Sequence, residues 1–328
     1  MKRRFRFSVL AVVATALVAS GCGDPSTSTG NGASAKPYRV VFIPGVTGNP
    51  FFSTIACGAS SVATKLNVDF SVQGPSTFSV SAQAPVVQAV AASHPDAIMI
   101  TNPDPKGLIA PLLAAQRSGI KIVNMDGDLA DKSVGVTNIE TDNYHGGELA
   151  GEAMANAIHG TGDVLVIDNA PGYPVTEQRR DGFVAAINKY PDIKLLPVQY
   201  SNNQTAAAAS IVSSTVAAHP DLAGVYSLQT NNTEGAATGV RAAHSVGKVK
   251  IVGWDSSPPI VAALENGTIT ADILQNPFGQ GVAGLESAVK AIKGEPVPRE
   301  QTESLMVATP ENIHTPTVQQ YVYKTTCS

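Results

Sequence analysis

The sequence predicts an α/β protein made of two similar Rossmann-like lobes, each a parallel sheet with helices on both faces. Three observations support this prediction. Short β-branched runs alternate with Ala-rich segments of helical length, 43% of the residues are hydrophobic and 15% are charged, and two motifs recur in the second half of the chain. Repeated strand-helix units are typical of parallel sheets that are covered by helices on both faces.

The predicted strands are the short β-branched runs. They lie at residues 39–43, 68–72, 97–101, 121–125, 163–168, 195–200, 224–228, 250–254 and 270–274. The predicted helices are the Ala-rich segments between them. They lie at residues 50–66, 79–93, 107–118, 143–159, 175–189, 205–218, 232–244, 258–266 and 278–293.

The second half of the chain repeats two motifs of the first half at nearly one offset. Ala91-Ala-Ser-His-Pro-Asp96 recurs as Ala217-Ala-His-Pro-Asp221, with the histidines 125 residues apart. Lys121-Ile-Val-Asn-Met-Asp126 recurs as Lys250-Ile-Val-Gly-Trp-Asp255, with the aspartates 129 residues apart. Ligands of open α/β sheets bind beyond the carboxyl ends of the strands. The two aspartates are therefore predicted to face each other across a cleft between the lobes.

The first 22 residues have the features of a secretory signal that ends at a cysteine for lipidation. Four basic residues precede an apolar run, and small residues precede Cys22. A membrane-spanning anchor is the alternative, but roughly 12 apolar residues fall short of the roughly 20 that a spanning helix needs. We predict a signal peptide at residues 1–21, a lipid on Cys22 and a flexible linker at residues 22–37. The protein is expected outside the cytoplasm, held to the membrane by lipid alone.

Without its signal the chain is acidic and contains two further cysteines. Removal of residues 1–21 takes four of the 22 basic residues and none of the 26 acidic ones, which leaves a net charge of −8. This charge gives no electrostatic attraction for nucleic acid. If Cys22 carries lipid, Cys57 and Cys327 remain as a pair in an oxidising compartment, and we predict a disulfide; two unrelated thiols are the alternative. In the chain-entropy model the bond stabilises the fold by on the order of 5 kcal/mol, and it pins the C-terminal tail to the first helix.

Polar and aromatic residues gather at the predicted strand ends and at the start of the first helix. Those assigned to the cleft are Asn49, Phe51, Phe52, Asn102, Asp126, Gln229, Trp254 and Asp255. Core packing is the alternative for the two phenylalanines. Planar polar groups can bond vicinal hydroxyls while aromatic faces cover a C–H surface. The cleft therefore suits a small polyhydroxylated ring.

From about Tyr38 to Met306 the chain resembles the periplasmic sugar-binding proteins of the ribose and galactose type. These are substrate receptors of ABC transporters, similar to LacI-type repressor cores. The matching motifs are Asn49-Pro-Phe-Phe52, Asn102-Pro103, the strand that ends in Asp126, Arg179-Arg-Asp-Gly-Phe183, Gly253-Trp-Asp255 and Gln275-Asn276. The resemblance implies a monomeric type 1 periplasmic binding protein with a three-stranded hinge. It would close on one sugar or polyol and deliver it to a permease.

Carried over position by position, the resemblance assigns the sugar contacts. They are Asn49, Phe52, Asn102, Asp126, Trp254, Asp255 and Gln275, to which we add Phe51, Arg179 and Gln229 from the same motifs and strand ends. The resemblance also implies hinge crossings near residues 139–142, 273–276 and 303–307. The first lobe would then contain residues 38–139 and 276–304, and the second residues 140–275 and 305–328.

The chain departs from the ribose receptors at three cleft positions. Gly127 follows the strand aspartate where they have arginine. Their arginine before the Gly-Phe helix aligns with Glu177, which leaves Arg179 two residues further on, and their second-lobe asparagine becomes Gln229. Because arginine is lost at two positions, we expect another pentose, a hexose or a sugar alcohol in place of ribose.

Other functions have weaker support in the sequence. Gly279-Gln-Gly-Val-Ala-Gly284 matches the dinucleotide pattern, but it begins about five residues after its strand, so close helix packing is favoured. A glycosidase could use Asp126 and Asp255 as acid and nucleophile, and a receptor for nucleosides or a furanosyl signalling molecule could use the same lobes. A repressor would need a helix-turn-helix where the signal and linker stand. With no histidines at helical metal-ligand spacing, we predict a receptor without metal or cofactor.

Overall fold

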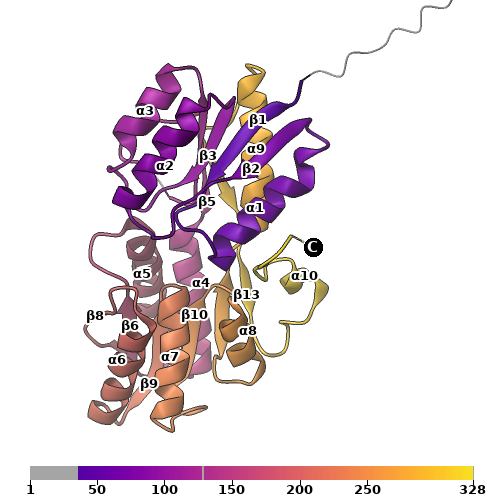
Figure 1. Cartoon of the computed structure of the whole chain (residues 1–328). Coiled ribbons are helices and arrows are strands. Elements are labelled where there is room, and N and C mark those ends of the chain that lie inside the picture. The colour runs from indigo at the N-terminus through magenta and orange to yellow at the C-terminus, as the bar shows by residue number, and fades with distance from the viewer. Residues whose placement is uncertain (1–35, 128, 328) are drawn as a thin grey trace, which may run out of the picture. The chain divides into compact units, whose positions relative to one another are not determined.

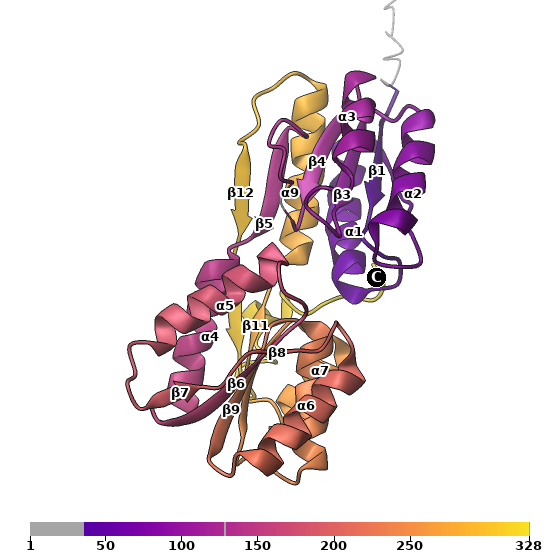
Figure 2. The same ribbon diagram turned by 90° about the vertical axis from the view of Figure 1, so that its left-hand side faces the viewer.

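A computed structural model describes residues 36–127 and 129–327, which form two sheets flanked by helices (Figure 1 and Figure 2). The predicted signal peptide, Cys22 and nearly all of the predicted linker lie outside the described residues. Within the described part, no helix is both long and apolar enough to cross a membrane.

The first lobe is built on a six-stranded parallel sheet with the strand order β12-β5-β4-β3-β1-β2. Its strands are β1 (Tyr38–Ile43), β2 (Val68–Val72), β3 (Ala97–Thr101), β4 (Lys121–Met125), β5 (Thr137–Thr141) and β12 (Glu300–Glu303). One face packs against α1 (Pro50–Ala63) and α9 (Pro277–Ile292), and the other against α2 (Val80–Ala92) and α3 (Ile109–Arg117).

The second lobe has the strand order β13-β11-β10-β9-β6-β7, with β8 also paired to β6. Its strands are β6 (Gly162–Asp168), β7 (Ile193–Leu195), β8 (Gln199–Tyr200), β9 (Leu222–Ser227), β10 (Lys250–Trp254), β11 (Ala271–Leu274) and β13 (Met306–Ala308). The pairs are parallel except that of β11 with β13. One face packs against α4 (Asn143–Ala157) and α5 (Pro174–Ile187), and the other against α6 (Thr205–Ala218), α7 (Thr230–Ala242) and α8 (Pro258–Glu265).

The strands differ from the prediction in two ways. The predicted strand at 195–200 is divided into β7 and β8, because Pro197 lies between them and has no N–H for a ladder hydrogen bond. The sequence does not predict β5, β12 or β13. These strands are short, and β5 and β12 consist largely of polar residues, so they lack the β-branched runs on which the prediction depends.

Glycines in α9 allow this helix to lie close to its neighbours. A Cβ on Gly281 would collide with the backbone carbonyl of Ile55 in α1, and one on Gly284 would meet the side chains of Met99 and Met125. A Cβ on Gly279 would meet the side chains of Asn276 and Glu303. Close packing therefore accounts for all three glycines of the G-x-G-x-x-G pattern at residues 279–284.

The chain crosses between the two sheets three times, from β5 to α4, from β11 to α9 and from β12 to β13. Two crossings end at a helix N-cap. The Asp142 carboxylate accepts a hydrogen bond from the His145 N–H at 3.0 Å, and the Asn276 side-chain oxygen accepts one from the Gly279 N–H at 2.9 Å. These caps satisfy free N–H groups of the first helical turn. Both helices can therefore begin directly after the chain has changed lobes.

The C-terminal segment contacts both lobes. The sequence assigns residues 305–328 to the second lobe, and Ile313 and Val318 do pack in its core. Tyr323, however, joins the core of the first lobe, and Cys327 forms a disulfide with Cys57 in α1, the pair that the sequence predicts. The end of the tail is therefore a further connection between the lobes, beside the three crossings.

Candidate ligand-binding site between the lobes

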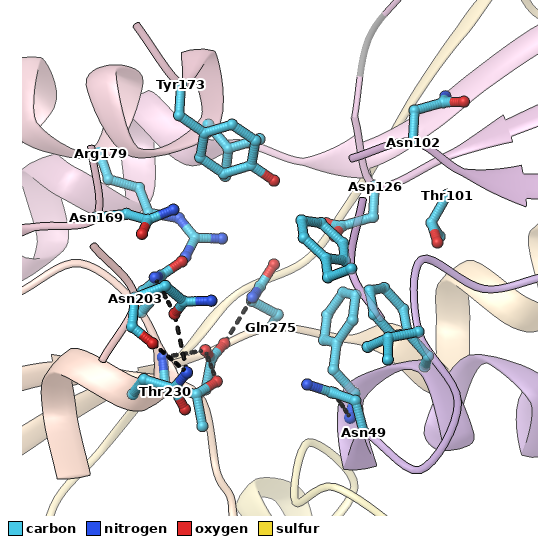
Figure 3. A pocket seen from close by; sticks show the side chains of 18 residues that line it. Asn49, Thr101, Asn102, Asp126, Asn169, Tyr173, Arg179, Asn203, Thr230 and Gln275 are labelled. Carbon is cyan, nitrogen blue, oxygen red and sulfur yellow. Dashed lines mark hydrogen bonds between the residues drawn. The ribbon is translucent and has the colours of Figure 1, made fainter. Parts of the chain in front are cut away.

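A cavity of about 240 Å³ lies between the lobes, where strands of both sheets end (Figure 3). Nine of the ten predicted binding residues line it: Asn49, Phe51, Phe52, Asn102, Asp126, Arg179, Gln229, Asp255 and Gln275. In Figure 3, Asn49, Asn102 and Asp126 face Arg179 and Tyr173 across the space, and Gln275 lies between the two groups. A molecule bound here would touch both lobes at once.

The repeated aspartates have matching backbone geometry. Asp126 has a φ of 46° and Asp255 a φ of 80°, in the left-handed region that Asp enters more readily than most residues. The N–H of Asp126 donates to the Ile139 carbonyl at 2.8 Å, and that of Asp255 donates to the Ile273 carbonyl at 3.0 Å. The internal repeat thus extends to the backbone conformation at the cavity.

Trp254 does not line the cavity, contrary to the prediction that it covers the cleft mouth. Its side chain is fully buried in the core of the second lobe. The guanidinium carbon of Arg179 lies 3.7 Å from the ring centroid, and the indole N–H donates to the Tyr226 hydroxyl at 2.8 Å. Because successive strand residues point to opposite faces, the last residue of β10 points into the core while Asp255 begins the loop at the cavity.

Arg179 is held firmly at the cavity wall. It is 3% exposed, its Nε donates to the Asn143 side-chain oxygen at 2.9 Å, and its Nη1 donates to the Leu228 carbonyl at 2.9 Å. Neither bond uses Nη2. Glu177 instead accepts a hydrogen bond from the Gly172 N–H and does not line the cavity. The site therefore keeps one arginine, Arg179, which the sequence analysis assigned to the cleft.

Asp126 presents a carboxylate that no described protein group uses as a hydrogen-bond acceptor. Burial raises the pKa of its carboxyl to about 7. The positive charge of Arg179 opposes this rise, whereas the negative charges of Asp255 and Glu140 add to it. A half-buried carboxylate without donors is costly for a protein, and its position at the cavity indicates that a ligand supplies them.

Asn102 presents a second unused group. Its side chain is 5% exposed, and neither amide atom finds a hydrogen-bond partner within the described part of the chain. Most buried polar atoms in folded proteins are paired. Asn102 and Asp126 follow the neighbouring strands β3 and β4, so both unsatisfied side chains belong to one wall of the cavity.

Asp255, by contrast, is saturated by the protein. Its Oδ1 accepts from the Gln275 Nε2 at 2.7 Å and from the Tyr323 hydroxyl at 2.6 Å. Its Oδ2 accepts from the N–H and the hydroxyl of Thr230, at 2.8 and 2.5 Å. A carboxylate has about four acceptor positions. The two repeated aspartates therefore differ: Asp126 offers acceptors to the cavity, and Asp255 fixes the groups around it.

Several lining residues are absent from the prediction. Asn169 directly follows β6, so the strand-end rule that selected Asn102 could have found it. Phe78, which stacks on Phe52 with ring centroids 6.2 Å apart, comes from a loop without a recognisable pattern. Asn203 also lies in a loop, where it accepts a hydrogen bond from Gln229 at 2.7 Å. Tyr173, the N-cap of α5, is likewise brought to the cavity by its loop.

The fold and the site together define a class: a two-lobed α/β binding protein with a polar and aromatic cavity for a small solute between its lobes. The comparison with known families agrees, because the model of the periplasmic binding protein domain matches residues 40–296. The chain belongs to this periplasmic binding protein family.

Individual relatives cover most of the chain. It is 27% identical over 290 residues to the D-ribose/D-allose-binding protein of Pseudomonas aeruginosa. The aligned region covers 85% of this chain and 90% of that protein. The solute-binding protein of an ABC transporter from Agrobacterium vitis, solved with α-D-tagatopyranose, is 32% identical with a TM-score of 0.83. That match covers 88% of this chain and 99% of the other.

A second solved structure has a similar fold and a lower sequence identity. It is a carbohydrate transporter solute-binding protein from Agrobacterium radiobacter in complex with D-arabinose, 26% identical with a TM-score of 0.81. The match covers 88% of this chain and 100% of that one. These similarities show the type 1 periplasmic binding protein fold. They also identify the chain as a binding protein and not an enzyme.

Proposed function

We propose that the protein binds a neutral monosaccharide or sugar alcohol between its lobes and delivers it to the permease of an ABC transporter. The observation that carries this proposal is one wall of the cavity, where the Asn102 amide has no partner in the described part of the chain. The Asp126 carboxylate and the rings of Phe51 and Phe52 line the same cavity. The amide donates and accepts, the carboxylate accepts, and the phenyl rings cover apolar C–H surface. Vicinal hydroxyls on a small ring or chain match this arrangement.

The charges of the cavity favour a neutral ligand. Two carboxylates, Asp126 and Asp255, line it together with one guanidinium, that of Arg179. A sugar acid would bring a further negative charge beside Asp126 into a partly dehydrated space, where charge repulsion is strong. The proposal therefore takes neutral sugars and polyols as ligands and excludes their acids.

The relatives support the same class of ligand. The Pseudomonas aeruginosa protein is named for D-ribose and D-allose, and the two Agrobacterium proteins are bound to tagatopyranose and D-arabinose. Because these sugars differ, they support a sugar as the class of ligand but do not single out one sugar for this protein. A ligand that contacts both lobes binds the closed arrangement best, and this preference shifts the lobes toward closure.

A thermal-shift screen of the purified protein tests the proposal. Neutral aldoses, ketoses and sugar alcohols form the main panel, with nucleosides and sugar acids as comparison arms. A ligand at 100 times its Kd adds about 2.7 kcal/mol of stability, which is a clear rise in melting temperature. A rise with a neutral sugar or polyol is expected. A rise with nucleosides alone would replace the proposed ligand by the nucleoside alternative, and turnover of a ligand would contradict the receptor function.

We also propose that a lipid on Cys22 anchors the protein outside the cytoplasm, with the segment up to residue 37 as a linker. The sequence of residues 1–22 supports this proposal. A tether would raise the effective concentration of the receptor near its permease. Mass spectrometry of the N-terminus from the native membrane fraction is expected to show a chain that begins at a diacylated Cys22. An unmodified N-terminus at another residue would contradict it.

A further inference from the structure

The C-terminal tail runs from the second lobe to the first, directly behind the ligand cavity. The Ser256 hydroxyl donates to the Tyr321 carbonyl at 3.1 Å and accepts from the Tyr323 N–H at 3.0 Å, which holds the tail against the loop after β10. The next residue already bonds to the first lobe, because the Lys324 N–H donates to the Thr54 hydroxyl at 2.6 Å. Tyr323 thus stands at the point where the tail changes lobes.

Tyr323 contacts three residues that line the cavity, although it does not line the cavity itself. Its hydroxyl donates to the Asp255 Oδ1 at 2.6 Å and accepts from the Gln275 Nε2 at 3.4 Å. Its ring packs edge-on against Phe51, with centroids 5.5 Å apart. Burial and the adjacent Asp255 carboxylate raise the pKa of the phenol well above its usual value, so it stays a donor at physiological pH. One side chain therefore orients cavity residues of both lobes and of the hinge.

The disulfide is the only covalent anchor of the end of this tail in the described part of the chain. Residues 324–327 are exposed, and chain ends fray unless they are tied down. Beyond Tyr323, the Thr54 hydroxyl bonds to the backbone of Lys324, and the Cys57–Cys327 disulfide attaches the tail to α1. The Lys324 ammonium also lies 4.6 Å from the Phe278 ring centroid in α9. Of these, only the disulfide cannot exchange with water. The bond is thus placed to keep Tyr323 seated behind Asp255.

We propose that Tyr323 is a positioning residue of the ligand site and that the Cys57–Cys327 disulfide holds it there. The end of the C-terminal tail, from Tyr323 onward, is then part of the binding machinery, and ligand affinity depends on the disulfide. This inference rests on the proposed function for its ligand, but not for its geometry. Without the phenol hydroxyl, Asp255 loses one partner of Oδ1, and the side chain of Gln275 loses a contact that fixes it in the hinge.

The first test compares Tyr323→Phe with Tyr321→Phe. Both changes remove one hydroxyl from the same tail, but the Tyr321 hydroxyl bonds to Ser304 and not to Asp255. With a sugar identified by the screen, calorimetry is expected to give a Kd about tenfold weaker for Tyr323→Phe and within about twofold of wild type for Tyr321→Phe. An unchanged Kd in Tyr323→Phe, or an equal loss in both variants, would overturn the proposal.

A ligand-free readout separates this inference from the proposed function. The Thr230 N–H is at the first position of α7, has no partner within the helix, and donates to Asp255 Oδ2. Its hydrogen exchange therefore reports the position of Asp255. Exchange at Thr230 is expected to accelerate in Tyr323→Phe but not in Tyr321→Phe. It should also stay unchanged in Val212→Ala, a destabilising change at a fully buried residue of α6 in the second-lobe core. If no sugar binds the wild type, the proposed function fails, and the Thr230 amide still decides the role of Tyr323.

The second test removes the disulfide. The double variant Cys57→Ser/Cys327→Ser is expected to weaken sugar binding and to accelerate Thr230 exchange as Tyr323→Phe does, and reduction of the wild type should have the same effect. Combined with Tyr323→Phe, the cysteine changes should weaken binding no further, because both act through one residue. Full affinity and unchanged exchange without the bond, or losses that simply add, would show that the disulfide does not act through Tyr323.

Discussion

Replacement of Asp126 by asparagine is expected to weaken sugar binding about a hundredfold, while it stabilises the unliganded protein at alkaline pH. The carboxylate accepts no hydrogen bond from the described protein, so its acceptors are free for ligand hydroxyls, and each charged hydrogen bond contributes roughly 1.5–3 kcal/mol. The amide is a weaker acceptor and turns a donor toward the same hydroxyls. Calorimetric titration with the sugar from the screen measures the loss.

The gain in stability follows from the pKa of Asp126. In the folded protein burial raises this pKa from its usual value of 3.8 to about 7. The stability that goes with the raised pKa is fully present below about pH 3.8 and is lost as the pH rises through 7. Asparagine does not ionise, so the advantage of Asp126→Asn in the free energy of unfolding should grow by about 2–3 kcal/mol between pH 5 and pH 8. Urea unfolding at several pH values measures it.

Asp255→Asn is the matched comparison, because it makes the same change at the other copy of the repeat. Four protein donors surround Asp255, so an amide there brings its own N–H groups against them. This variant is expected to lose stability at pH 8, where Asp126→Asn gains it. If both variants shift stability in the same direction, or if Asp126→Asn binds sugar as wild type does, the roles assigned to the two aspartates are wrong.

Arg179→Lys is the second change for which we expect a large effect. Lysine keeps the charge, but its ammonium cannot bond Asn143 and Leu228 from two separate nitrogens as the guanidinium does. It also lacks the flat group that covers Trp254 in the wild type. Buried acceptors left without partners cost about 1–3 kcal/mol each. We therefore expect the free energy of unfolding to fall by about 2 kcal/mol and the Kd for sugar to rise at least about tenfold.

Arg180→Lys provides the control for the neighbouring position. The Arg180 side chain is partly exposed, bonds to Asp181 and does not line the cavity. It also lies 3.7 Å from the buried Asp168 carboxylate, and lysine keeps the charge of that pair. Chemical denaturation and calorimetry of both variants should show a loss of binding at residue 179 only. Equal binding in the two lysine variants would contradict a role for Arg179 in the site.

The sequence predicted most of the fold because the signals involved are local. The buried strands at 97–101, 121–125 and 250–254 match the structure residue for residue, since continuous apolar runs between turn residues mark them. The strand-end rule then located Asn102, Asp126 and Gln229 at one cavity. These inferences need only the period of a strand and the direction of a parallel sheet.

The prediction failed where long-range contacts override local pattern. The strand β5 is polar along most of its length, yet it is largely buried between β4 and β12, so only its neighbours identify it as a strand. Trp254 appeared suited to stack on a sugar, but Tyr226 and Arg179 hold it in the core. Phe78 and Asn203 come from loops, and the packing of each loop against its lobe determines where these side chains lie.

The sequence by itself determined the fold class, the internal repeat, the cysteine pair and the polar and aromatic chemistry of the cleft. Each of these follows from composition, from residue spacing or from the order of the strands. Only the tertiary structure decided which of the two repeated aspartates is free. Both have the same local sequence context and the same backbone conformation. Their difference arises from Thr230, Gln275 and Tyr323, which approach Asp255 from other parts of the chain and fill its acceptors. Hydrogen-bond saturation is a property of neighbours in space, and local sequence does not encode it.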